Sequence, residues 1–101
     1  MRPGNIKISQ DEIKNFCRQR RITELALFGS VLRDDFHPES DVDVLVTFAS
    51  DTRYSLFDLA SIREELATIL EREVDLVEKA ALRNPFRRHY ILKNSEVIYA
   101  A

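Results

Sequence analysis

The chain has 101 residues, of which 45% are hydrophobic and 32% charged, with two glycines and three prolines. This composition is typical of a folded globular protein and excludes a disordered or fibrous one. The formal net charge of −2 argues against general nucleic-acid binding, because proteins that coat a duplex carry an excess of Lys and Arg. The apolar runs are too short or too charged to span a bilayer, so no membrane association is expected.

The length predicts a single small domain, residues 1–101. The N-terminal residues include no apolar segment of the kind that a signal peptide requires. Cys17 is the only cysteine, which excludes an internal disulfide and fits a reducing compartment. We therefore expect a cytoplasmic protein whose small core allows self-association, or assembly with another subunit, to add stability.

The first half of the chain predicts one helix followed by two strands. Ser9 is a suitable N-cap, and Glu12 stands at the spacing that completes a capping box. The apolar residues 25–28 predict a short buried strand. After a polar, turn-prone stretch, residues 41–48 are rich in Val and Leu and predict the clearest strand of the chain.

The second half predicts two helices and two strands. Ser55 and Asp58 repeat the capping spacing at the start of a helix. Residues 73–77 predict a strand, Asn84-Pro85 begins a last helix that runs to about residue 93, and residues 96–99 predict a final strand. An apolar stripe marks one side of the helix that begins near Ser55, facing the core or a second copy: Leu59, Ile62, Leu66, Ile69 and Leu70.

This order of elements predicts an α/β (α+β) fold with a mixed sheet of about four strands and helices packed on it. Asp41 and Asp43 are two residues apart on one predicted strand, so their carboxylates point to the same face, with Val42 on the other. Two carboxylates near an apolar interior repel each other, and a divalent cation would relieve that repulsion. Oxygen ligands favour Mg²⁺ or Mn²⁺.

Two further segments complete the candidate site. Gly29-Ser30 ends an apolar strand where a helical turn is expected, and such a turn presents amides, and here a hydroxyl, to a phosphate. Arg33, one turn later, is placed to reach a phosphate or to stay on the surface. Asp75 lies within an apolar strand, and if that strand neighbours the one with Asp41, three carboxylates meet and two metal ions about 3.5–4 Å apart become feasible.

The segment Leu27-Phe28-Gly29-Ser30, ten residues, and then Asp41-Val42-Asp43 resembles the signature of the DNA polymerase beta superfamily of nucleotidyltransferases. The short chain and the run from Ser40 to Val46 are similar to its minimal nucleotidyltransferase (MNT) branch. The resemblance implies ATP as substrate and Mg²⁺, with two ions expected. It also implies metal-binding and catalytic roles for Asp41, Asp43 and Asp75. The nucleotide-binding residues that it implies are Gly29, Ser30, Arg33 and Ser40.

MNT proteins are commonly paired with a helical HEPN ribonuclease toxin, so the resemblance implies an antitoxin that transfers AMP to a hydroxyl, expected to be a tyrosine, of such a partner. One position departs from the pattern, because many relatives have Gly where this chain has Asp34, followed by Asp35. The added negative charge leaves open a second interpretation, a non-catalytic antitoxin that neutralises its toxin by stable docking. A small-molecule adenylyltransferase is a third, less favoured one.

Several other residues have simpler explanations. Asp75 alone would also suit a salt bridge, and Cys17 suits a core position. His89 and Tyr90 lie beside Arg87 and Arg88, which by default form a solvated basic face.

Overall fold

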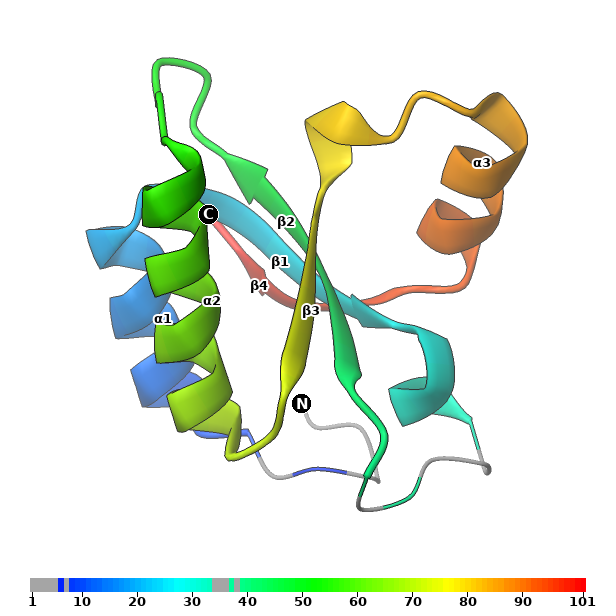
Figure 1. Cartoon of the computed structure of the whole chain (residues 1–101), viewed down its shortest axis with the longest axis horizontal. Coiled ribbons are helices and arrows are strands. Elements are labelled where there is room, and N and C mark those ends of the chain that lie inside the picture. Colours follow the sequence, from blue (N-terminus) through cyan, green and yellow to red (C-terminus); the bar gives the residue numbers. More distant parts are fainter. Residues whose placement is uncertain (1–5, 7, 34–36, 38) are drawn as a thin grey trace.

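The computed structural model describes residues 6, 8–33, 37 and 39–101, and Figure 1 shows how they are arranged. The helices and strands follow the order predicted from the sequence, with two short 3-10 turns, η1 and η2, between them. The elements are α1 (Gln10–Gln19), β1 (Ile22–Phe28), η1 (Gly29–Leu32), β2 (Val42–Phe48), α2 (Leu56–Leu70), β3 (Val74–Glu78), η2 (Lys79–Ala81), α3 (Pro85–Lys93) and β4 (Glu96–Ala100). No helix in the described ranges is long and apolar enough to cross a membrane.

The four strands form one mixed sheet in the order β3-β2-β1-β4, as the predicted fold class requires. β1 is antiparallel to both β2 and β4, whereas β2 and β3 are parallel and α2 connects them. β1 begins at Ile22 rather than at Leu25, because the polar Thr23 and Glu24 hide the start of a strand that is paired on both sides. The parallel pairing brings the N-terminal ends of β2 and β3 to the same edge of the sheet.

The sheet carries a large core on one face and a small core on the other. α1 and α2 cover the first face, and α3 lies against the second (Figure 1). Side chains alternate along β2, so that Val42 and Val44 enter the large core while Leu45 enters the small one. The small core consists of Ala26, Leu45, Leu82 and Ile91, with Phe28 and Val77 packed against it. This second face is therefore covered incompletely, which leaves space between the sheet and α3.

Side chains cap the helices at the residues that the sequence indicates. The Ser9 hydroxyl accepts a hydrogen bond from the amide of Glu12, which is half of the predicted capping box. Ser55 and Asp58 form the complete reciprocal box at the start of α2. Asn84 accepts from two amides in the first turn of α3. Local sequence thus sets the beginning of each helix.

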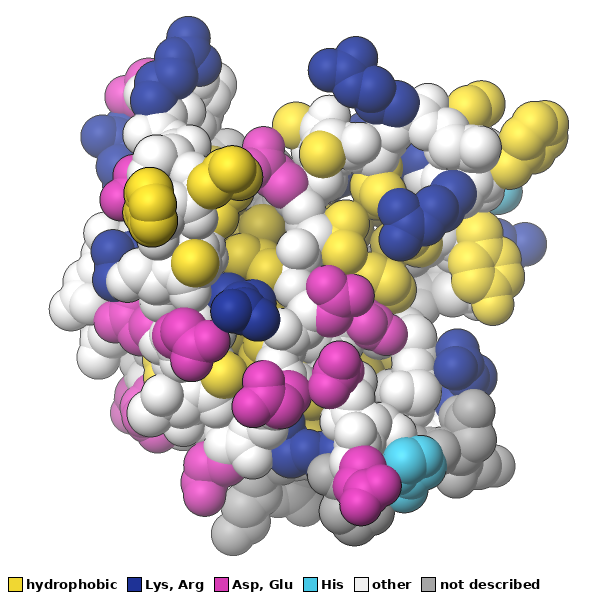
Figure 2. Space-filling view, viewed as in Figure 1, with side chains coloured by type: hydrophobic (Ala, Val, Ile, Leu, Met, Phe, Trp, Pro, Cys, Tyr) yellow, Lys and Arg dark blue, Asp and Glu magenta, His cyan; other side chains and the backbone are white. Residues whose placement is uncertain are grey.

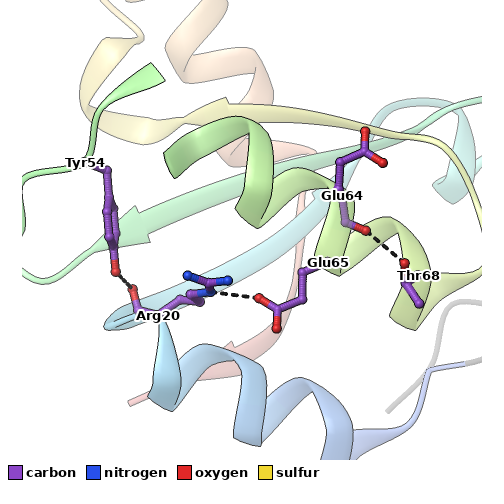
Figure 3. A network of polar contacts seen from close by, with 5 residues as sticks. All are labelled: Arg20, Tyr54, Glu64, Glu65 and Thr68. Carbon is purple, nitrogen blue, oxygen red and sulfur yellow. Dashed lines mark hydrogen bonds and ion pairs between the residues drawn. The ribbon is translucent and has the colours of Figure 1, made fainter. Parts of the chain in front are cut away.

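Polar contacts fasten α1 to α2, as Figure 3 shows. Nε of Arg20, the residue that ends α1, donates to Oε1 of Glu65 on α2 at 2.7 Å. The Tyr54 hydroxyl donates to the carbonyl oxygen of Arg20 at 2.6 Å, and within α2 the Thr68 hydroxyl donates to the carbonyl oxygen of Glu64 at 3.1 Å. The apolar stripe of α2 faces the large core, where three of its residues are buried: Ile62, Leu66 and Leu70.

Candidate functional site

Two of the predicted aspartates are neighbours in the sheet. Asp43 of β2 and Asp75 of β3 are register partners in the parallel pair. Asp41 precedes the first residue of β2, so it belongs to the same edge of the sheet. Asp43 lies on the α3 face together with Leu45, as the alternation along the strand predicted.

The surroundings of Asp43 disfavour its negative charge. Burial raises the pKa of the Asp43 carboxyl above its ordinary 3.8, and the charges of Asp75 and Asp41 raise it further. The guanidinium of Arg33 acts in the opposite direction, and a hydrogen bond with the Asp75 carboxyl adds to the increase in pKa. A cation bound at Asp43 would relieve this repulsion, so the electrostatics favour a cation site here.

Gly29 brings the backbone directly against Asp43. It follows β1, whose last residue, Phe28, is the register partner of Asp43, and its φ of +77° lies in the left-handed region. A Cβ atom at Gly29 would overlap Oδ2 of Asp43. Glycine satisfies both the backbone angle and the close approach. Gly29 is the first residue of η1, a four-residue 3-10 turn, which is too short to have the dipole of a longer helix.

Gly29 and Asp43 open into a pocket of about 540 Å³ between the sheet and α3. This volume lies within the range of small-molecule sites. Figure 2 shows acidic side chains near the middle of this face, over β2 and β3, and basic side chains on the α3 side as well as around the loop between β2 and α2. The pocket is lined by Phe28, Gly29, Leu32, Arg33, Asp43, Arg87, Tyr90, Ile91 and Asn94.

The pocket gathers only part of the predicted site. Gly29, Arg33 and Asp43 line it. The other predicted residues do not belong to its wall: Ser30, Ser40, Asp41 and Asp75. Asp75 is the register partner of Asp43, and Asp41 lies two residues before Asp43 in the chain. Both therefore adjoin a residue of the pocket wall.

Ser40 belongs to a hydrogen-bonded turn that leads into β2. Its Oγ accepts from the amide of His37 at 3.2 Å, and its own amide donates to the His37 carbonyl oxygen at 2.9 Å. Nη2 of Arg72 donates to the carbonyl oxygens of His37 and Ser40 at 2.7 and 2.6 Å. These bonds fix the backbone just before Asp41. Asp34, the departure from the family pattern, lies outside the described residues together with Asp35.

Within the part of the chain that the structure describes, no three His, Cys, Asp or Glu side chains are gathered closely enough to hold a metal ion alone. The donor set nevertheless fits Mg²⁺, because it consists of carboxylate oxygens and includes an aspartate, Asp43, whose charge is disfavoured by its neighbours. Mg²⁺ commonly takes one or two carboxylates together with substrate phosphates. The residues therefore fit a metal ion that binds together with a triphosphate.

Sequence reasoning missed the wall that α3 contributes. Arg87 and Tyr90 are exposed, as expected of a solvated basic face, and they also line the pocket, as does Asn94. Their spacing with the buried Ile91 places all four on one side of the helix. That spacing is present in the sequence, but it indicates a pocket wall only when α3 is known to lie over the face of the sheet that carries Asp43.

A second pocket, of about 550 Å³, lies at the opposite end of β2. Its walls come from the connection between β2 and α2 and from the end of β3, with Arg53 and Glu78 as its charged residues. It contains neither the aspartates nor the Gly29 turn. The acid cluster and the left-handed glycine therefore identify the pocket beneath α3 as the candidate site.

Known proteins resemble this chain over most of its length. The protein adenylyltransferase MntA of Thermococcus cleftensis is 33% identical over 78 residues, which cover 77% of this chain and 74% of the relative. A Methanocaldococcus jannaschii protein, a candidate protein adenylyltransferase, is 31% identical over 96 residues, covering 87% of this chain and 94% of the relative.

Solved structures share the fold. A candidate minimal nucleotidyltransferase is 28% identical with a TM-score of 0.69, over 85% of both chains. A toxin–antitoxin structure with AMP-PNP has a TM-score of 0.73 at 22% identity, covering 93% of this chain and 75% of the other. Residues 10–98 match the model of the nucleotidyltransferase domain. With the aspartate pair and the Gly29 turn at its site, the chain belongs to the nucleotidyltransferase domain family.

Proposed function

We propose that this nucleotidyltransferase transfers AMP from ATP, with Mg²⁺, to a tyrosine hydroxyl of a HEPN-type toxin, and thereby acts as an antitoxin. The observation that carries the proposal is the juxtaposition of Asp43 with Asp75 and Gly29, since Gly29 and Asp43 line a pocket of about 540 Å³. The names of the relatives support a protein as the acceptor of AMP, because two of them are called protein adenylyltransferases. One structural neighbour is a tri-AMPylated Shewanella oneidensis HEPN toxin in complex with an MNT antitoxin, with a TM-score of 0.64.

The chain's own residues take distinct roles in this proposal. Asp41 and Asp43 would hold the metal, and the backbone at Gly29-Ser30, with Arg33, would receive the triphosphate. Ser40 contributes through the turn that sets Asp41. When bound, Mg²⁺ neutralises the triphosphate and favours departure of pyrophosphate. Asp75, the register partner of Asp43, would accept the proton of the acceptor hydroxyl.

These groups account for each bond that forms or breaks in the transfer and for the proton that moves. The acceptor oxygen forms a bond to the α-phosphorus of ATP while the bond from that phosphorus to the bridging oxygen breaks. The proton of the acceptor hydroxyl passes to the carboxylate of Asp75, and pyrophosphate leaves with the electron pair of the broken bond. The products are pyrophosphate and a partner that carries AMP in a phosphodiester bond.

Transfer of α-³²P from ATP to a co-expressed partner toxin tests the proposal. We expect Mg²⁺-dependent label on the partner, and its loss in Asp41→Ala/Asp43→Ala. Asp51→Ala, an exposed aspartate paired with Arg21 far from the site, should label the partner as the natural chain does. If the natural chain binds and neutralises the partner without labelling it, the enzymatic proposal fails and a docking antitoxin remains.

A further inference from the structure

One side of α3 faces the pocket that contains Asp43. Arg87, Tyr90 and Asn94 recur at intervals of three and four residues, so they stand in one row along the helix. Ile91, beside Tyr90, is 5% exposed and anchors this side of α3 in the small core. The row therefore forms a wall of the pocket opposite the sheet.

Hydrogen bonds hold this wall in place. Nη1 of Arg88 donates to the carbonyl oxygens of Lys79 and Leu82 at 3.0 and 3.4 Å, which ties α3 to η2. At the other end of the helix, Nδ2 and the amide of Asn94 both donate to the carbonyl oxygen of Tyr90, at 2.8 and 3.1 Å. Two neighbouring arginines thus differ in position: Arg88 contacts backbone, whereas Arg87 lines the pocket.

Besides Asp43 and Asn94, the lining consists of two chemical parts. Phe28, Leu32, Tyr90 and Ile91 provide apolar and aromatic surface, and Arg33 and Arg87 provide positive charge. A nucleoside triphosphate has the same division, because a flat, largely apolar base is joined to a polyanion. Aromatic rings stack on any base, and Arg suits phosphate recognition.

We propose that α3 forms the wall of this site that contacts the nucleotide: Tyr90 stacks on the base, and Arg87 contacts the triphosphate. This inference rests on the proposed function, since it takes the ATP of that reaction as the ligand. It adds two binding residues that the aspartate and Gly-Ser pattern does not contain. Tyr90 is 63% exposed, so its ring is accessible to a base.

Calorimetric titration with two probes, Mg²⁺ with ATP and Mg²⁺ with inorganic tripolyphosphate, separates the two contacts. Tyr90→Ala should weaken ATP binding about tenfold, the size expected for one base–aromatic stack, and leave tripolyphosphate binding unchanged. Tyr90→Phe should bind both probes as the natural chain does, because it keeps the ring. Arg87→Gln should weaken both probes by similar factors.

Matched variants on the same helix provide the controls. Phe86 is 85% exposed and lies outside the pocket wall, so Phe86→Ala should bind both probes normally. Lys93→Gln removes a positive charge from α3 away from the wall and should also have no effect. Circular dichroism of each variant verifies that α3 is intact.

The outcomes distinguish this inference from the proposed function. If the natural chain binds both probes and Tyr90→Ala binds ATP equally well, the inference is overturned while the proposed function stands. Equal losses of ATP and tripolyphosphate in Tyr90→Ala would also overturn the stacking role, because they would indicate a distorted pocket. If the natural chain binds neither probe, both fail.

Discussion

At the scale of single residues, Gly29 and Asp43 depend on each other. The backbone of Gly29 occupies the space beside Oδ2 of Asp43 and has a φ that other residues adopt at a cost. The close approach places the main chain next to a carboxylate whose charge is already disfavoured. A carboxylate that is kept in a place where its charge is disfavoured is a physical reason to regard this position as functional.

Gly29→Ala should therefore displace Asp43. We expect a loss of about 1–2 kcal/mol in the free energy of unfolding from the left-handed φ, a further loss from the overlap of the new Cβ with Asp43, and about a hundredfold lower AMP transfer from the misplaced carboxylate. Denaturant titration and initial rates measure the two effects. In an Asp43→Ala background the same glycine substitution should cost less stability, and an equal cost in both backgrounds would refute the steric conflict.

Asp43→Asn should stabilise the metal-free protein at neutral pH. Because the folded pKa of Asp43 lies above the ordinary 3.8, the ionised carboxyl is disfavoured by folding, and its stability contribution is lost as pH rises through the folded pKa. The gain in melting temperature should therefore be full at pH 7.5 and fade as the pH falls toward 3.8 and below. Calorimetric melting without divalent ions measures it.

Asp51→Asn is the matched control for that series, since Asp51 is an exposed aspartate that Arg21 already pairs. It should give no gain and a loss of at most about 1 kcal/mol at neutral pH. A gain of the same size in both variants would mean that the effect of Asp43→Asn is one of net charge rather than of the cluster with Asp75 and Asp41.

At the scale of elements, local signals in the sequence were sufficient to predict most of the fold. Ser9, Ser55 and Asn84 cap the three helices, and the alternation around Asp43 assigned its face correctly. The sequence did not indicate that α3 borders the site. Arg87 and Tyr90 are exposed as expected, but only the packing of α3 through Ile91 places them beside the pocket that contains Asp43.

The capping box of α2 makes a measurable contribution to the free energy of unfolding. Ser55→Ala removes the acceptor for the amide of Asp58 and should lower the free energy of unfolding by about 1 kcal/mol. Ser61→Ala makes the same substitution within the exposed face of α2 and should be neutral or slightly stabilising, because Ala is the better helix former. Equal losses in the two variants would contradict the assigned cap.

At the scale of the whole molecule, the order of the strands creates the site. Asp43 and Asp75 are far apart in sequence and become neighbours because α2 returns the chain to a parallel position beside β2. The sequence could indicate that both are strand acids, but their pairing depends on the sheet order. The large core beneath them, on the side of α1 and α2, keeps the strands in register.

Cys17 reports on the integrity of that core. Burial raises the pKa of its thiol from 9.0 to about 12, so its thiolate fraction at neutral pH is roughly a thousandfold below that of a free thiol. We expect iodoacetamide to label the native protein no faster than it unfolds globally, and to label it readily in denaturant. Rapid labelling under native conditions would show that α1 opens separately from the sheet.

The most direct test of the central claim is the position of Mn²⁺ by anomalous scattering in crystals grown with Mn²⁺ and a non-hydrolysable ATP analogue. We expect a peak bound by Asp41 and Asp43, with the triphosphate at Gly29-Ser30 and the nucleotide in the pocket beneath α3. A metal and nucleotide in the pocket at the opposite end of β2, beside Arg53 and Glu78, would contradict it.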